Sequence, residues 1–113
     1  MSQITTHILD TARGCPAEGV CIVLYVQQTD QWVEIGRGCT NSDGRIADLI
    51  EPDTTLDEGV YRMHFEVSGY FRNRGHQHFY PYVDVVFNVA GDGQHYHIPL
   101  LLSPYGYSTY RGS

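Results

Sequence analysis

The closing stretch YHIPLLLSPYGYSTYRGS (residues 96–113) decides the fold of this chain. Side chains along a strand point alternately to the two faces of a sheet, so a period of two in hydrophobicity indicates a strand. Residues 95–103 show that period, and they predict a strand with one apolar face and one mixed face. The apolar face holds Tyr96, Ile98, Leu100 and Leu102, and the mixed face holds His95, His97, Pro99, Leu101 and Ser103.

A tight turn is predicted directly after this strand, at Ser103-Pro104-Tyr105-Gly106. Proline suits the second position of such a turn, and glycine closes it. A further strand is expected from Tyr107 to Gly112, and it ends the chain. We therefore expect the carboxylate of Ser113 to be held near whatever that last strand borders.

Upstream, the sequence predicts short strands separated by turns and loops. One short helix is expected at 68–75, with Ser68 as its N-cap and Gly75 just beyond its end. Seven or eight strands at this spacing predict an all-β fold, an antiparallel β-sandwich with Greek-key-like pairing. Strands are expected at 4–10, 20–28, 32–37, 45–48, 60–67 and 83–89, loops at 11–19 and 51–58, and inward faces at Tyr61, Met63, Phe65, Val67 and at Val83, Val85, Phe87, Val89.

Length and charge narrow the class of protein. At 113 residues, the chain is expected to form one domain over residues 1–113. A formal net charge of −6 argues against a nucleic-acid partner. No apolar run is long enough for a membrane helix, and the first residues lack the pattern of a signal peptide. Together these features predict a cytoplasmic protein without a membrane partner.

The three cysteines, Cys15, Cys21 and Cys39, cannot all pair with one another. Their spacing is not that of a CxxC metal motif. We interpret them as reduced thiols, which agrees with a cytosolic location.

Six histidines are the candidates for chemistry, although a lone histidine on a strand is more often structural. His64 falls on the polar face of its strand. His76 and His78 lie in a loop without a further metal ligand at suitable spacing. His95 and His97 share a strand face at about 6.6 Å, which leaves chelation open without implying it. We expect no metal and no cofactor.

Four segments together resemble the transthyretin-like (prealbumin-like) family, and specifically its enzyme branch, the 5-hydroxyisourate hydrolases. They are ITTHILD (4–10), GCPA (14–17), TNSDGR (40–45) and the closing stretch, and the resemblance covers nearly the whole chain. It implies the family's β-sandwich. It also implies a homotetramer, a dimer of dimers, with sites in a channel between the dimers.

The resemblance also implies the site residues. His7, Arg45 and His97 match the motif positions of the enzyme branch. In the hormone-carrying transthyretins these positions are not His, Arg and His, and the ending Tyr-Arg-Gly-Ser is absent. The implied catalytic residues are His7, Arg45 and His97; the implied substrate-binding residues are these three with Tyr110, Arg111, Gly112 and Ser113. His95 lies outside the matched motif and has no assigned role.

The implied reaction suits these side chains. Hydrolysis of 5-hydroxyisourate, a product of urate oxidation in purine catabolism, adds water to a ring carbonyl. The ring then opens to 2-oxo-4-hydroxy-4-carboxy-5-ureidoimidazoline. A neutral imidazole can take the proton from water, a contribution of about 10²–10⁴-fold. We assign His7 or His97 as this base without ordering the two, and Arg45 as the group that stabilises charge on the attacked carbonyl.

Two other functions remain as hypotheses. A transthyretin-type carrier would bind a small aromatic ligand without turnover, but its channel should be mostly apolar. A zinc-binding sandwich would use histidine pairs and lose stability with a chelator.

Overall fold

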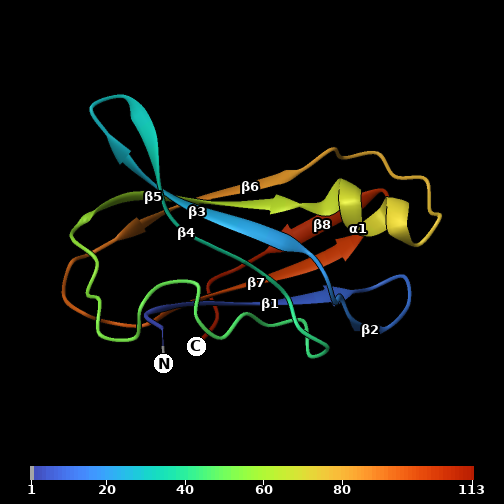
Figure 1. Cartoon of the computed structure of the whole chain (residues 1–113), viewed down its shortest axis with the longest axis horizontal. Helices are drawn as coiled ribbons and strands as arrows, with labels where there is room; N and C mark the ends of the chain where they lie inside the picture. Colours follow the sequence, from blue (N-terminus) through green and yellow to red (C-terminus); the bar gives the residue numbers. More distant parts are fainter. Residues whose placement is uncertain (1) are drawn as a thin grey trace.

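Strands from the two halves of the chain pack into two β-sheets that lie face to face, with one short helix at one end (Figure 1). The computed structural model describes residues 2–113. The sheet orders are β2-β1-β7-β8 and β4-β3-β5-β6. The elements are β1 (Ile4–Asp10), β2 (Cys15–Pro16), β3 (Cys21–Gln28), β4 (Gln31–Cys39), β5 (Gly59–Glu66), α1 (Val67–Asn73), β6 (Val83–Val89), β7 (Tyr96–Ser103) and β8 (Gly106–Thr109). The predicted β-sandwich with one short helix is confirmed.

One strand pair differs from the expected antiparallel pattern. β1 and β7 run parallel, with Thr5 opposite His97 and His7 opposite Pro99. A parallel pair needs a long crossover connection, and here the whole second sheet lies between the two strands in the sequence. This register places the histidine of the first strand near the histidine of the last long strand.

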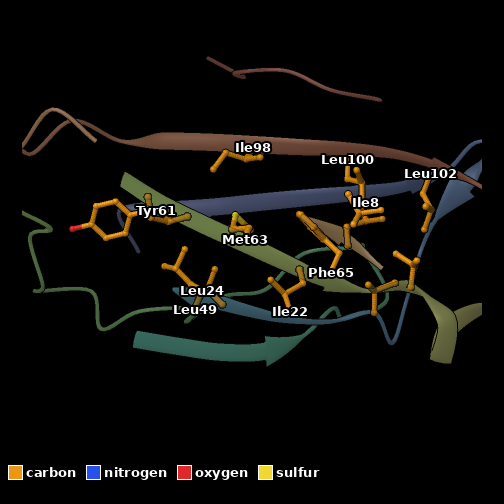
Figure 2. Close-up of a cluster of buried hydrophobic side chains, with 14 of the residues drawn as sticks. Ile8, Ile22, Leu24, Leu49, Tyr61, Met63, Phe65, Ile98, Leu100 and Leu102 are labelled. Atoms are coloured by element: carbon orange, nitrogen blue, oxygen red, sulfur yellow. The ribbon is translucent and has the colours of Figure 1, made fainter. Parts of the chain in front are cut away.

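The core lies between the two sheets and is built from the predicted alternation (Figure 2). The residues on the apolar face of β7 are at most 5% exposed, and the inward residues of β5 are equally buried. Because neighbouring residues point the opposite way, Thr5, His7 and His97 lie on the outer face of the sheet β2-β1-β7-β8. The buried set includes Ile22, Leu24, Tyr61, Met63, Phe65, Ile98, Leu100 and Leu102.

Three local expectations were wrong. The segment 45–48 is not a strand, since only Arg45 pairs, as an isolated bridge to His7, before the chain turns inward to bury Leu49 and Ile50. The last strand ends at Thr109 instead of Gly112, and Gly112 forms an isolated bridge to His97. A two-residue strand, β2, interrupts the predicted loop 11–19 because it pairs with the end of β1.

The short helix begins one residue earlier than predicted, and Ser68 is not its N-cap. Glu66 takes the cap position without a side-chain hydrogen bond. The hydroxyl of Ser68 instead donates to the carbonyl oxygen of Pro81. Gly75 does follow the helix end, with a φ of +70° that suits glycine.

The expectation of three reduced cysteines is corrected. Cys21 and Cys39 are opposite each other on β3 and β4 and form a disulfide, whereas Cys15 is free. Strand register, which cysteine spacing does not reveal, brings the two thiols together. Since disulfides are rare in cytosolic proteins, the cysteines no longer support a cytoplasmic location. Among residues 2–113, no helix is long and apolar enough to cross a membrane.

Candidate active site

A cavity of about 490 Å³ lies beside the outer face of the sheet β2-β1-β7-β8. Four stretches that are far apart in the sequence meet around it: the first strand, the turn that follows β4, the start of β7 and the last residue. Its lining combines imidazole, guanidinium, hydroxyl and amide groups with apolar surface. The lining residues are Thr5, Thr6, Asn41, Arg45, Ile46, Ala47, His95, His97 and Ser113.

Arg45 reaches the cavity from a tight turn that Asn41 organises. The side-chain oxygen of Asn41 accepts hydrogen bonds from the backbone N–H groups of Asp43 (2.9 Å) and Arg45 (3.1 Å). Gly44, at a φ of +74°, passes so close to β1 that its carbonyl oxygen accepts from the N–H of Ile8 at 2.9 Å. This Asx-type turn therefore docks Arg45 directly against β1.

His97 is held from its backbone and from its ring. The N–H of Gly112 donates to the carbonyl oxygen of His97 at 2.8 Å, which joins the end of the chain to β7. The ring nitrogen Nδ1 lies 2.9 Å from the hydroxyl oxygen of Thr5 on β1. The imidazole of His97 is thus oriented by both of its neighbouring segments.

The surroundings of His97 favour its neutral form. Burial lowers the pKa of its imidazole below the usual value of 6.5, and the nearby charge of Arg45 lowers that pKa further, with smaller contributions from His95 and His7. Both effects disfavour a second positive charge in the cavity. At neutral pH this imidazole therefore has a free lone pair and can accept a proton.

The remaining predicted site residues divide into two groups. Ser113 lines the cavity, whereas His7 lies on the same strand face as Thr5 and forms a backbone bridge with Arg45 but is not among the lining residues. Tyr110 and Arg111, in contrast, line a separate cavity of about 330 Å³. The guanidinium of Arg111 lies 4.7 Å from the ring centre of Tyr96 and donates to Gln94. A contact of Tyr110 or Arg111 with substrate stays a prediction.

Among the lining residues to which the sequence assigned no role are Thr5, Asn41 and His95. Thr5 contacts two imidazoles, Asn41 holds the turn of Arg45, and His95 shares the cavity with His97. The i, i+2 spacing of His95 and His97 does signal their shared face, whereas the contact of Thr5 with both rings depends on the parallel register of β1 and β7, which the sequence does not reveal.

The other histidines make ordinary hydrogen bonds. His64 lies between the carboxylates of Asp84 (2.6 Å) and Glu66 (2.7 Å), and Nε2 of His78 lies 3.0 Å from the hydroxyl of Ser68. Within the part of the chain that the structure describes, no three His, Cys, Asp or Glu side chains are grouped to hold a metal ion.

Comparison with known proteins identifies close relatives. Residues 4–112 match the model of the HIUase/Transthyretin family. A 5-hydroxyisourate hydrolase from Mus musculus is 46% identical over 114 residues, which span 99% of this chain and 96% of the mouse protein. A probable 5-hydroxyisourate hydrolase from Caenorhabditis elegans is 49% identical over 112 residues, which span 99% of this chain and 82% of the worm protein.

Solved structures show the same fold. Sea bream transthyretin in complex with thyroxine superimposes with a TM-score of 0.92 at 34% identity, covering 98% of this chain and 95% of the other. The 5-hydroxyisourate hydrolase of Klebsiella pneumoniae has a TM-score of 0.86 at 34% identity and is covered completely, as is this chain. Since one fold serves both a hydrolase and a thyroxine-binding protein, the residues at the cavity have to distinguish the two functions.

Proposed function

The chain belongs to the HIUase/Transthyretin family, and on that premise we propose that it is a hydrolase that opens the ring of 5-hydroxyisourate in urate breakdown. Relatives named for this activity are similar to the chain over nearly its full length. The single observation that carries the assignment is the partly buried His97, with a lowered pKa, in one cavity with Arg45. A base next to a fixed positive charge is what the addition of water to a carbonyl requires.

The cavity also suits the substrate. Its volume of about 490 Å³ lies within the usual range for small-molecule sites, about 300–1,000 Å³. The planar guanidinium of Arg45 offers several N–H donors to the ring oxygens of a flat, polar bicycle. Residues 1–113 act as one catalytic domain in this proposal, with no metal or cofactor.

We assign the proton transfers as follows. The lone pair of His97 takes a proton from water while the water oxygen forms a bond to the ring carbonyl carbon. Arg45 donates hydrogen bonds to the oxygen that becomes negative. The tetrahedral intermediate then breaks its carbon–nitrogen bond, and the leaving nitrogen takes a proton from an imidazole, for which His7, whose backbone forms a bridge with that of Arg45, is the candidate. His97 then releases its proton to solvent, and His7 regains one from solvent.

Single substitutions test this assignment. His7→Ala, Arg45→Ala and His97→Ala should each lower turnover at least about 100-fold, the scale of a lost base or oxyanion donor. Turnover is followed by stopped-flow absorbance with freshly generated 5-hydroxyisourate after subtraction of its spontaneous decay. His76→Ala, in an exposed loop, is the matched control and should keep full activity. Unchanged turnover in all three site variants, with circular dichroism like that of the wild type, would contradict the assignment.

A carrier function is the second candidate, because the fold matches a transthyretin that binds thyroxine. Arg45 and the histidines of the lining favour the hydrolase, because a carrier needs neither a base nor a positive charge beside that base. Saturable thyroxine binding without any turnover of 5-hydroxyisourate would favour the carrier over the hydrolase.

We further propose a homotetramer, a dimer of dimers. β6 and β8 are edge strands, and an open edge that carries exposed apolar side chains is a liability unless a partner covers it. Val86 on β6 is 56% exposed, and Tyr107 on β8 is 42% exposed. Light scattering after size-exclusion chromatography should give four times the 12.8 kDa chain mass; a monomer mass would remove the proposal.

A cytoplasmic location stays a prediction.

A further inference from the structure

We propose that the hydroxyl of Thr5 and the imidazole of His95 set the tautomer of His97, so that both are positioning residues for its role as a base. The catalytic part of this inference rests on the proposed function. The hydrogen-bond arrangement itself belongs to the resting protein and can be measured without substrate.

The hydroxyl of Thr5 bridges two imidazole rings. Its oxygen lies 2.9 Å from Nδ1 of His97 and 2.8 Å from Nε2 of His95. The parallel register puts Thr5 directly opposite His97, and His95 lies two residues earlier on the same side. The two rings are nearly parallel, with their centres 6.4 Å apart, so the hydroxyl fits between them.

Counting protons shows that the two tautomers are linked. A hydroxyl has one hydrogen to donate, and a neutral imidazole has one N–H and one acceptor nitrogen. Of the two ring nitrogens next to Thr5, one accepts the hydroxyl hydrogen, and the other must donate its own N–H to the hydroxyl oxygen. The two imidazoles therefore take opposite roles towards Thr5.

Only one of the two arrangements makes His97 a base. If Nδ1 of His97 donates to Thr5, its other nitrogen, Nε2, has a free lone pair, and Thr5 donates to Nε2 of His95. In the reverse arrangement Nε2 of His97 carries the hydrogen and cannot accept a proton. A partner hydrogen bond commonly selects the tautomer of a functional histidine in this way.

The exposure of the two rings favours the productive arrangement. His95 is exposed, so water can satisfy its remaining N–H, whereas His97 is partly buried and has fewer partners. His95 can thus take whichever tautomer accepts the Thr5 hydrogen. We infer that the acceptor nitrogen of His95 directs the Thr5 hydroxyl away from His97 and leaves Nδ1 of His97 as the donor.

Ring-nitrogen NMR of histidine-labelled protein tests the inference without substrate. In the wild type, His97 should carry its hydrogen on Nδ1. Thr5→Val, which preserves the shape of the side chain, and His95→Phe should both shift His97 towards the Nε2–H form. Thr5→Ser retains the hydroxyl and should restore the wild-type signals. Wild-type His97 with its hydrogen on Nε2, or an unchanged tautomer in Thr5→Val, would overturn the proposal.

Kinetics test the catalytic consequence. Thr5→Val should lower kcat about 10- to 100-fold, the scale for partners that orient a functional histidine, with KM nearly unchanged, and Thr5→Ser should recover most of the loss. Thr109→Val is the matched control, because the hydroxyl of Thr109 also binds β7 but donates to the carbonyl oxygen of Pro99. Equal kcat in Thr5→Val and wild type would overturn the positioning role. A wild type without turnover but with the expected tautomer would refute only the proposed function.

Discussion

The imidazole of His97 occupies the space that a side chain at Gly112 would need. A Cβ atom built on Gly112 would lie 2.5 Å from Cδ2 of His97 and 3.2 Å from Cγ. The backbone of Gly112 is held in place at the same time, because its N–H donates to the carbonyl oxygen of His97. The penultimate residue of the sequence therefore helps to position the imidazole that we assign as the base.

Gly112→Ala should misplace that imidazole. The new methyl group can be accommodated only if the ring of His97 shifts, and a misplacement of about 1 Å can cost about 100-fold in rate. We expect kcat/KM to fall at least about 10-fold while the thermal midpoint stays close to that of the wild type. Gly69→Ala in α1 is the control, since a Cβ there meets nothing within 4 Å. Equal loss in both variants would show that the effect does not come from His97.

The pH dependence of the reaction should report the lowered pKa of His97. Burial and the charge of Arg45 lower this pKa, so the lone pair stays free at pH values where an ordinary histidine is protonated. The acid limb of kcat/KM against pH should therefore have its midpoint below 6.5. In an NMR titration, Arg45→Gln should raise the pKa of His97 because it removes a nearby positive charge. A midpoint above 6.5 in the wild type would contradict this reading of the cavity.

The same shift has a consequence for stability. The unfolded chain binds a proton at His97 near pH 6.5, whereas the folded chain binds it only at lower pH. The titration of His97 therefore leaves the free energy of unfolding unchanged above about pH 6.5 and lowers it as the pH falls below that value.

Tyr70→Phe should destabilise the fold without touching the cavity. The hydroxyl of Tyr70 in α1 donates to Oδ2 of Asp10, which is only 3% exposed, at 2.6 Å. Without that donor the carboxylate of Asp10 loses a buried partner, so we expect a loss of about 1–3 kcal/mol in the free energy of unfolding. Urea denaturation measures it. Tyr105→Phe, at a residue that is 66% exposed, should leave the midpoint unchanged; matching midpoints in both variants would refute the prediction.

The disulfide between Cys21 and Cys39 should contribute measurably to stability. It closes a loop with a sequence separation of 18, and such a closure stabilises by about 3 kcal/mol. A reductant should lower the thermal midpoint of the wild type to that of the double variant Cys21→Ser with Cys39→Ser. Cys15→Ser should keep the wild-type midpoint. Titration of three free thiols in the untreated, denatured protein would contradict the disulfide.

Strand positions and core faces could be predicted because they depend on local sequence. In β5 and β7, alternate residues are apolar, and these are the residues that pack between the sheets. The short helix was placed within one residue, since Gly75 marks its end. The false strand at 45–48 shows the limit of local reasoning: burial of Leu49 and Ile50 outweighs any preference of that segment for an extended ladder.

The sequence by itself determined the all-β class, the faces that form the core and, through its resemblance to a family, the three residues on which we base the reaction. Side-chain alternation and turn residues act within a few positions, so they can be read along the chain. Only the tertiary structure decided that Thr5 lies between His95 and His97, that Gly112 makes room for an imidazole, and that Cys21 meets Cys39. Each of these contacts depends on which strands pair and in which register. Pairing between distant strands is chosen by the packing of the whole core, and no single segment contains that information.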